Sequence, residues 1–409
     1  MDRKTLTEKA KSHLNVLCSE IGERRVGGEG NRRATAYAEQ VLHALGWQTE
    51  ATELAVMDWK TDGAELSCGG QSFEVFSSQY SLGCSVKGEL AAINSIAQLE
   101  QTDINGKLVL LYGEIAAEQI APKKFPFWNP EEHQHLISVL EKGNPKALLC
   151  ATTRNAAAAG GVYPFPLFED GDFDIPSVYM KDTEGEKLLT FVGQQAELIS
   201  KTERIPESAF NIIGRNSTRT EERVVITAHI DTKIDTPGAI DNGTGVAILL
   251  LLAELLQDYS GAHPIDLVMF NGEDYYGAPG QVTYVAQNDG KFGDILFNIN
   301  IDGAGYKEGP SCFSAFDLPK PIDEALREVL HTAPELVEGL PWYQGDHSVF
   351  LQNGCPAIAV SSQWFIENME SQEITHTPKD NLDIVNYESV AACALGIVEL
   401  IDKLCTRQG

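Results

Sequence analysis

The chain has 409 residues, which is too long for one simple hydrophobic core, so we expect two domains. Hydrophobic residues make up 43% of the sequence, and this content excludes an intrinsically disordered chain. The formal net charge of -28 argues against nucleic acid and anionic membranes as partners, because their phosphates would be repelled.

The first residues, MDRKTLTEKAKSHLNVL, contain no apolar stretch followed by a small-residue cleavage site, so we expect no signal peptide. The longest apolar run, VAILLLLAELL, is interrupted by Glu254 and is too short to span a bilayer. We therefore expect a soluble protein of the cytoplasm. The eight cysteines stand singly without a CxxC pair, and we expect them to be reduced and mostly buried.

The first elements in chain order are helical. Residues 5–21 carry apolar side chains at helical spacing, and the loop 23–31, ERRVGGEGN, separates them from a second helical segment at 32–45. Gly46 is the expected C-terminal cap of that second helix.

Between about residues 47 and 205 the sequence pattern changes and predicts short strands separated by turns. The expected strands are 107–113, 146–152 and 175–180, and helical pieces lie at 131–143 and 182–192. This middle region contains no cluster of acids and histidines with useful spacing.

Beyond residue 206, apolar strands alternate with helices. Such alternation is typical of a largely parallel sheet covered by helices on both faces. The expected strands are 211–214, 223–230, 264–271, 294–302 and 356–362, and the expected helices are 246–257, 321–333 and 387–405. We predict a three-layer α/β/α domain with a mixed, mainly parallel sheet, formed by residues 1–59 and 204–409, and a small β-rich domain inserted at 60–203.

Acids and histidines stand at the ends of several of these strands. They are His229 and Asp231 after VVITA, Glu273 and Asp274 after IDLVMFN, Asp302 after LFNIN, and His376 in the segment that follows PAIAVSS. Asp241 stands shortly before the apolar helix at 246–257. In open α/β sheets functional groups gather beyond the carboxyl ends of the strands, so we expect these side chains to lie together.

Zinc accounts for this collection of residue types. It prefers imidazole and carboxylate ligands, and two zinc ions about 3.5–4 Å apart need one carboxylate that bridges them. The predicted ligands are His229, Asp241, Asp274, Asp302 and His376. Asp231 lies two residues after His229, where its carboxylate can orient the imidazole. Glu273, next to a ligand, is the predicted general base for a water at the metals.

Some of these residues also have a plain structural explanation. Asp241 could cap the helix that follows it, and Glu273 with Asp274 could form a solvated turn. His263 and His331 are interpreted as surface or packing residues and receive no function. The metal hypothesis rests on the conjunction, because each acid or histidine follows an apolar strand or precedes a helix at one edge of the sheet.

The order of these motifs resembles the co-catalytic di-zinc aminopeptidase family, which also contains glutamate carboxypeptidases, glutaminyl cyclases and the non-catalytic transferrin receptor. His-x-Asp at 229 is followed twelve positions later by Asp-Asn-Gly-x-Gly, then by Gly-Glu-Asp, Ile-Asp-Gly and His-Thr-Pro-x-Asp. The loop 23–31 is similar to the family's opening loop, and the resemblance covers the N-terminal helices and everything from about residue 206.

The resemblance implies a role for each motif residue. It assigns His229 and Asp302 to one zinc ion, Asp274 and His376 to the other, and Asp241 to both. It also implies Glu273 as the general base, Asp231 as the residue that orients His229, and a cis peptide bond between Asp241 and Asn242. The segment 60–203 resembles the protease-associated domain that several family members carry as an insertion.

The chain also departs from the family pattern. Asp274 stands where glutamate is frequent, and Thr375 stands where some members carry a tyrosine that binds the oxyanion. Tyr343 and a water are the alternatives for that donor. Asp346 and His347, in GDHSVF, match a stretch near the family's cleft, where a functional and a loop-structural role are equally open. Members with the insertion are often secreted, whereas this chain shows no export signal.

Residues and resemblance together predict a zinc metallo-exopeptidase that uses two zinc ions. We expect an aminopeptidase, in which Glu273 activates a water bridging the metals for attack on a peptide, because the negatively charged site suits a free α-amine. A carboxypeptidase, a small-molecule amide hydrolase and a glutaminyl-cyclase-like enzyme are alternatives on the same site. A non-catalytic receptor is a remote alternative, because none of the expected ligands is missing.

Overall fold

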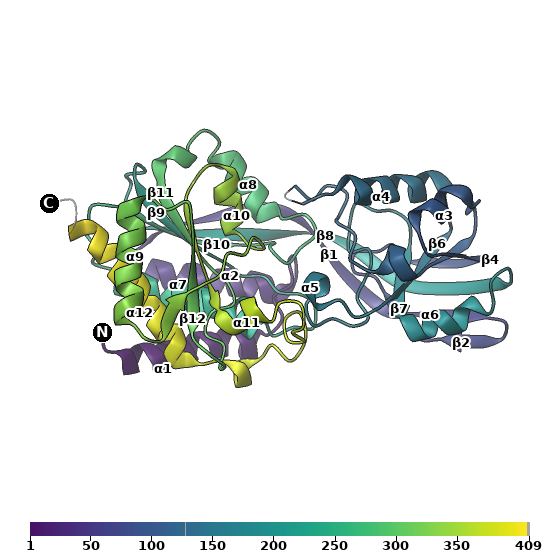
Figure 1. The fold of residues 1–409 in the computed structure, drawn as a ribbon, viewed down its shortest axis with the longest axis horizontal. Helices are drawn as coiled ribbons and strands as arrows, with labels where there is room; N and C mark the ends of the chain where they lie inside the picture. Colours follow the sequence, from purple (N-terminus) through teal and green to yellow (C-terminus); the bar gives the residue numbers. More distant parts are fainter. Residues whose placement is uncertain (127, 407–409) are drawn as a thin grey trace. The chain divides into compact units, whose positions relative to one another are not determined.

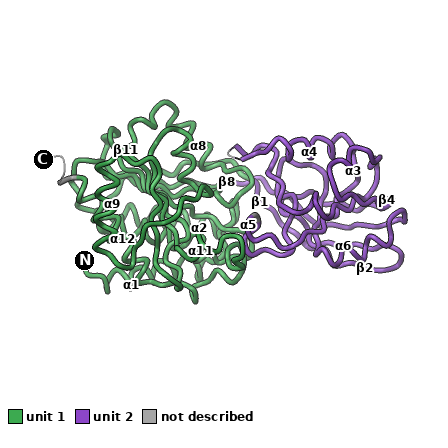
Figure 2. The backbone as a smooth tube through the Cα atoms, viewed as in Figure 1, with its two compact units in different colours: residues 1–56, 208–409 green, residues 57–207 purple. Residues whose placement is uncertain are grey.

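The computed structural model describes residues 1–126 and 128–406 and divides the chain into two compact units. Unit 1 contains Met1–Val56 and Ser208–Gly409, and unit 2 contains Met57–Glu207 (Figure 2). The boundaries lie inside two long strands, β1 (Gln48–Cys68) and β8 (Gln195–Arg215), whereas the sequence placed the insertion at 60–203. Each unit buries its own clusters of apolar side chains.

The sheet of unit 1 runs in the order β13-β12-β14-β11-β9-β10-β8. Besides β8, its strands are β9 (Arg223–His229), β10 (Ile265–Phe270), β11 (Ile295–Ile301), β12 (Ser311–Phe316), β13 (Leu336–Glu338) and β14 (Ala357–Ser362). β9 pairs in parallel with β10 and β11, and β11 pairs in parallel with β14. β8 and β12 add antiparallel pairs with β10 and β14, so the sheet is mixed and mainly parallel, as predicted.

Helices cover both faces of this sheet (Figure 1). One face carries α1 (Arg3–Asn15), α2 (Glu29–Ala44), α7 (Thr244–Leu255), α9 (Lys320–Thr332) and α12 (Tyr387–Thr406). The other carries α8 (Pro279–Gln287) and α10 (His347–Gln352), where Phe350 of α10 packs near Phe270 of β10. Short helical segments are η1 (Val16–Ile21), η3 (Ala239–Gly243), η4 (Phe292–Asp294), α11 (Gln363–Glu367) and η5 (Leu382–Ile384).

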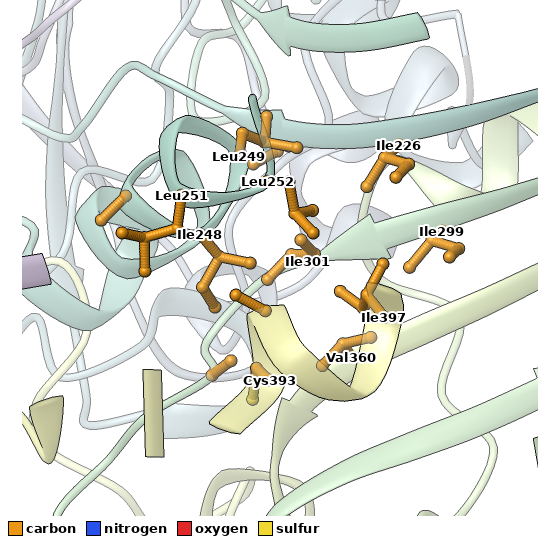
Figure 3. Close-up of a cluster of buried hydrophobic side chains, with 14 of the residues drawn as sticks. Ile226, Ile248, Leu249, Leu251, Leu252, Ile299, Ile301, Val360, Cys393 and Ile397 are labelled. Atoms are coloured by element: carbon orange, nitrogen blue, oxygen red, sulfur yellow. The ribbon is translucent and has the colours of Figure 1, made fainter. Parts of the chain in front are cut away.

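The core of unit 1 centres on α7, whose residues from Thr244 to Ala253 are all buried. Ile248 and Leu252 of this helix belong to one cluster with Ile226 of β9 and Ile299 of β11 (Figure 3). The apolar run that the sequence placed at 246–257 is therefore a helix at the centre of this buried core. Among residues 1–126 and 128–406, no helix combines the length and the apolar character needed to span a bilayer.

Strand alternation directs the predicted ligands away from this core. Successive side chains of a strand point to opposite faces of the sheet. Ala228 of β9 and Ile301 of β11 belong to the cluster around α7. The residues that follow them, His229 and Asp302, consequently point to the opposite face.

In unit 2, β4, β5, β6 and β7 pair in parallel, β3 pairs antiparallel with β7, and β8 pairs antiparallel with β4. Its elements are β2 (Gln71–Phe73), β3 (Phe76–Ser77), β4 (Cys84–Ile93), α3 (Ile96–Gln101), β5 (Leu108–Leu111), η2 (Gly113–Ala116), α4 (Glu131–Gly143), β6 (Ala147–Thr152), α5 (Ala156–Ala159), β7 (Ser177–Lys181) and α6 (Asp182–Leu189). Leu110 and Val109 of β5 enter different apolar clusters, so this sheet is buried on both faces. Its assignment as a protease-associated domain stays a prediction.

The sequence did not predict β1 or β12, and the reasons are physical. Along β1 buried positions are separated irregularly, and acidic residues such as Asp58 and Glu65 interrupt the apolar ones, so no period-two pattern arises. β12, SCFSAF, mixes small polar and apolar residues that are nearly all buried. The short helices α8, α10 and α11 are too brief for a helical period to stand out.

Candidate metal centre

His229 and Asp302 lie at the carboxyl ends of two neighbouring parallel strands. His229 is the last residue of β9, and Asp302 follows β11 directly. The pairing of Thr227 with Asn300 brings the ends of the two strands side by side. The Nε2 atom of His229 lies 3.7 Å from Oδ1 of Asp302.

Asp241 lies between the two predicted histidines. Its Oδ1 atom is 3.1 Å from Nε2 of His229, and its Oδ2 atom is 3.2 Å from Nε2 of His376. The two oxygens of one carboxylate thus face two different imidazoles, which is the arrangement that a bridging ligand requires. The peptide bond between Asp241 and Asn242 is cis, as the family resemblance implied.

Asp274 completes the side of the site that contains His376. Its Oδ1 atom lies 3.1 Å from Nε2 of His376, and its other oxygen is buried without a hydrogen-bond partner in the described part of the chain. Asp274 follows β10, and His376 lies in the loop before α12 with a left-handed φ of 64°. The structure therefore brings all the residues predicted as ligands to one place.

Asp231 organises the turn that contains Glu273 and Asp274. Its Oδ1 atom accepts a hydrogen bond of 2.8 Å from the N–H of Gly272, and its Oδ2 atom accepts one of 3.0 Å from the N–H of Asp274. The distance from Oδ1 to Nδ1 of His229 is 3.6 Å, which is longer than a hydrogen bond. In this geometry Asp231 fixes the 272–274 turn more directly than it orients His229.

Asp380 is a buried carboxylate beside the cluster to which the sequence reasoning gave no role. Its carboxylate is fully buried and accepts hydrogen bonds from the N–H of Ile240 at 2.7 Å and from the N–H of Asp241 at 2.9 Å. Burial and the nearby Asp241 carboxylate raise the pKa of Asp380 to about 7. Asp380 thus holds the backbone of Ile240 and Asp241. It ends the His-Thr-Pro-x-Asp motif, so the signal was present in the sequence without an assigned role.

The electrostatics of the cluster show a strong excess of negative charge. Burial alone would lower the pKa of His229, but the carboxylates of Asp231, Asp241 and Asp302 raise it well above its ordinary value. His376 behaves in the same way beside Asp274 and Asp241. In the absence of a metal, the histidines take protons to balance the acids.

Glu273 lies beside these ligands and is partly exposed. Partial burial raises the pKa of its carboxyl well above its usual value, the carboxylates of Asp274 and Asp302 add to the shift, and His229 opposes it. Glu273 therefore stands at the edge of the cluster, where its carboxylate can exchange a proton.

The donor set fits divalent metal ions. His229, Asp241 and Asp274 each offer one ligand atom, and these atoms lie within 4.8 Å of one another. Both ring nitrogens of His229 are buried without a hydrogen-bond partner in the described part of the chain, although buried polar atoms are normally paired. A cation among imidazole and carboxylate donors would satisfy these atoms and neutralise the acids, and zinc prefers such donors.

The other positions singled out from the sequence have structural partners. Nε2 of His347 donates to the carbonyl of Trp342 at 2.8 Å, and Thr375 Oγ1 accepts from Gln372 at 2.6 Å.

Oδ1 of Asp346 accepts a hydrogen bond from Gln281 at 2.7 Å, and burial raises the pKa of Asp346 to about 7. Tyr343 is 67% exposed. His263 is buried and lies 2.9 Å from the carbonyl of Glu222, which fits its interpretation as a packing residue.

The sheet and its cluster define an α/β protein with a carboxylate–histidine centre of the kind that metallohydrolases carry. Residues 211–401, slightly less than half of the chain, match the sequence model of peptidase family M28. The match includes each of the predicted ligands, Asp231 and Glu273. The family resemblance inferred from the motifs is thereby confirmed.

Two relatives among curated proteins carry related names. Aminopeptidase YwaD of Bacillus subtilis is 24% identical over 233 residues, which are 54% of this chain and 50% of that protein. The probable lipoprotein aminopeptidase LpqL of Mycobacterium tuberculosis is 26% identical over 300 residues, which are 69% of this chain and 56% of that protein. The chain thus spans about half the length of the curated relatives it matches.

Solved structures share the fold. The aminopeptidase from Aneurinibacillus sp. strain AM-1 aligns with a TM-score of 0.76 at 20% identity, over 98% of this chain and 93% of that one. BSAP, a zinc aminopeptidase from Bacillus subtilis, aligns with a TM-score of 0.74 at 19% identity, over 97% of this chain and 94% of that one. These likenesses confirm the predicted α/β class.

Proposed function

We propose that this protein is a zinc metallopeptidase that acts as an aminopeptidase and holds two zinc ions. The observation that carries the proposal is the position of the Asp241 carboxylate, whose two oxygens face His229 and His376 at 3.1 and 3.2 Å. One carboxylate shared between two imidazoles provides the bridge that a pair of metal ions requires. The family match of residues 211–401 and the names of the relatives support the same function.

In the proposed centre, His229 and Asp302 would hold one ion, and Asp274 and His376 would hold the other. Asp241 would be shared between them, and Asp380 keeps the backbone of Asp241 in place through the N–H groups of residues 240 and 241. When bound, the ions would supply Lewis acidity at the scissile carbonyl and lower the pKa of the attacking water.

Glu273 acts as the general base in this proposal. Its backbone neighbours are fixed by Asp231, which accepts hydrogen bonds from the N–H groups of Gly272 and Asp274. This support holds the Glu273 carboxylate at the edge of the cluster, where it takes a proton from water and returns it to the leaving amine.

A free α-amine is the expected feature of the substrate. The five carboxylates of the site (Asp231, Asp241, Glu273, Asp274 and Asp302) outnumber the four positive charges that two zinc ions would bring, so a positively charged amino terminus is favoured over a carboxylate. The same charge disfavours a carboxypeptidase. A small amide hydrolase and a glutaminyl-cyclase-like enzyme remain the alternatives, because they use the same donors. The complete set of predicted ligands argues against a non-catalytic receptor.

The test combines metal content with a matched substrate panel. The full chain is purified, its zinc content per chain is measured, and a set of aminoacyl-anilides is compared with the N-acetylated form of each member. We expect two zinc ions and cleavage of the free-amine substrates alone. Cleavage that ignores acetylation would move the function to an amidase or carboxypeptidase, and a chain that binds no metal would overturn the proposal.

The location and the domain assignment stay predictions as well. We propose the cytoplasm from the sequence, while one of the relatives is described as a probable lipoprotein. We also propose that unit 2 is a protease-associated domain, on the basis of the resemblance of the segment 60–203. Fractionation of the native cells with an antibody against the chain tests the first proposal directly.

A further inference from the structure

Arg24 is one of the largest side chains that are fully buried in this structure. Guanidinium groups are seldom buried unless they are paired, because removal of a charge from water is costly. Among residues 1–126 and 128–406, the hydrogen bonds of this guanidinium go to backbone carbonyls, and it approaches the sulfur of Cys18 at 4.0 Å. Such an arrangement directs the N–H donors of the side chain at the backbone.

The carbonyls that Arg24 binds lie at the two ends of the loop 230–238. Its Nε donates to the carbonyl of Ile230 at 2.9 Å. Its Nη1 and Nη2 donate to the carbonyls of Pro237 at 2.7 Å and of Gly238 at 2.8 Å. Ile230 directly follows His229, and Gly238 directly precedes η3, which contains Asp241. One side chain therefore sets the spacing of the two segments that carry these ligands.

The same guanidinium connects the loop to the N-terminal turn. Nη1 also donates to the carbonyls of Leu17 at 3.2 Å and Gly22 at 3.1 Å. The backbone N–H of Arg24 donates to Oγ1 of Thr232 at 2.8 Å, which adds a third attachment within the loop. The loop is thus fixed from outside by a segment that contributes no ligand.

The packing at Gly238 shows how close this contact lies to the site. A Cβ atom at Gly238 would meet the backbone oxygen of Asp241 at 2.5 Å and Nη2 of Arg24 at 3.0 Å. Gly238 has a φ of 57°, a left-handed conformation that favours glycine. The guanidinium and the backbone of the bridging ligand therefore approach the same glycine from two sides.

We propose that Arg24 is a positioning residue that holds His229 and Asp241 at the separation needed to share a metal ion. This inference rests on the metal centre proposed above. Arginine suits the task because its planar fork presents five N–H donors in a fixed geometry, whereas a lysine ammonium is a point charge on a flexible stem. Lysine at this position keeps the charge but cannot bind both ends of the loop.

The test compares Arg24→Lys and Arg24→Met with Arg223→Lys in the full chain. Arg223 is the control, because it is also a buried arginine, 5% exposed, but lies at the other end of β9, where it binds the carbonyl of Thr220 at 2.9 Å and pairs with Asp266 at 3.3 Å. Cobalt(II) is the probe, and its affinity is measured by competition with a chromophoric chelator while its visible absorption reports ligand geometry. We expect Arg24→Lys to raise the cobalt Kd by about 10- to 100-fold and to change the spectrum.

The control separates positioning from stability. All three substitutions are expected to lower the melting temperature. Arg223→Lys alone should retain the wild-type cobalt Kd and spectrum. If Arg24→Lys and Arg24→Met bind cobalt as the wild type does, Arg24 has no positioning role and the metal centre still stands. If the wild-type chain itself binds no cobalt, the metal centre is wrong, and the inference about Arg24 falls with it.

Hydrogen exchange on the wild type keeps the inference testable if the Arg24 variants do not fold. Zinc should slow amide exchange in residues 17–24 together with residues 230–241, because Arg24 couples the two segments. The helix α9 serves as the reference for any general stabilisation. Protection of 230–241 without 17–24 would overturn the coupling.

Discussion

The two faces of the sheet in unit 1 are built from the same strands but have opposite chemistry. On the α7 face, Ile226 and Ile299 are fully buried among aliphatic side chains (Figure 3). On the opposite face their neighbours in sequence, Thr227 and Asn300, form a hydrogen bond of 2.8 Å, and the predicted ligands follow at the strand ends. Neighbouring residues of one strand therefore lie in opposite environments, one in the apolar core and the next on the polar face.

This difference means that the two faces affect the free energy of unfolding in opposite ways: the apolar face stabilises the fold, and the polar face reduces its stability. Burial of one large aliphatic side chain stabilises a fold by about 1.5–3 kcal/mol, and the α7 face collects many such side chains. The opposite face leaves polar atoms buried without a hydrogen-bond partner among the described residues, including Oδ2 of Asp274. Unpaired buried polar atoms reduce stability by about 1–3 kcal/mol each, which metal binding would recover.

Asp241→Ala should break the polar face most severely. Removal of the shared carboxylate takes one donor from the His229 side and one from the His376 side. We expect zinc content to fall below two ions per chain and peptidase activity to disappear, while α7 and the sheet remain folded. Metal analysis and circular dichroism on the same sample check this. A variant that keeps both ions would exclude Asp241 as the bridge.

Glu273→Gln should separate catalysis from metal binding on the same face. The change keeps the shape of the side chain and removes its capacity to accept a proton. We expect kcat to fall by about 10²- to 10⁴-fold with zinc content near wild type, because general-base catalysis contributes an effect of this size. Steady-state kinetics with metal analysis measure both. If Glu273→Gln and Asp241→Ala lost metal equally, the two roles would be wrongly assigned.

Ile299→Ala should damage the α7 face and spare the site. Ile299 is fully buried in β11, between Asn298 and Asn300, which point to the other face. Truncation of such a side chain should lower the free energy of unfolding by about 2–5 kcal/mol. The zinc Kd of the folded protein should stay unchanged. Urea unfolding and chelator competition measure the two quantities, and a large change in Kd would show that the faces are coupled.

The α7 face could be predicted almost completely from the sequence, because a run such as VAILLLLAELL has one physical explanation once a membrane span is excluded. Alternating strands and helices fixed the class of the main domain for the same reason. β1 was not predicted, since residues such as Asp58 and Glu65 remove any apolar period along it. Pattern reasoning works where burial is regular and fails where a strand is exposed.

The sequence identified which residues lie on the polar face, but not the hydrogen bonds that hold them in place. Metal-ligand chemistry and strand ends identified the acids and histidines that the structure brings together. Asp380 and Arg24 were not identified, because each acts on backbone groups of distant segments. Such contacts join residues separated by more than a hundred positions and leave no local pattern. Asp231 was given one role, and its hydrogen bonds to the 272–274 turn appear only in the folded chain.

Asp380→Asn should sharpen the comparison by weakening the site without removing a ligand. The two carboxylate oxygens of Asp380 accept the N–H groups of Ile240 and Asp241, and an asparagine can accept only one of them. We expect the zinc Kd to rise by about 10- to 100-fold, as for other residues that support metal ligands. Chelator competition measures it. Asp383→Asn, three residues along the chain, is the control, and equal effects of both variants would contradict a specific role.

His347→Gln should give the smallest effect at neutral pH and reveal a contrast within the polar face. His229 stands among acids that raise its pKa, whereas burial lowers the pKa of His347 from 6.5 to about 4, although its bond to the Trp342 carbonyl opposes the shift. The unfolded chain therefore binds a proton at His347 before the folded chain does, so stability is full above pH 6.5 and is lost as the pH falls toward 4.

At pH 4 this loss should reach up to about 3 kcal/mol in the wild type. Glutamine stays neutral and can still donate to the Trp342 carbonyl, so it should remove that part of the pH dependence. Urea unfolding of both proteins from pH 4.5 to 7 measures the difference between the two curves, which cancels the titration of other groups. Parallel curves would mean that His347 is protonated equally in both states. If the wild type loses more stability than His347→Gln as the pH falls, His347 is neutral in the folded protein. A buried histidine on this face then stays neutral unless acids surround it.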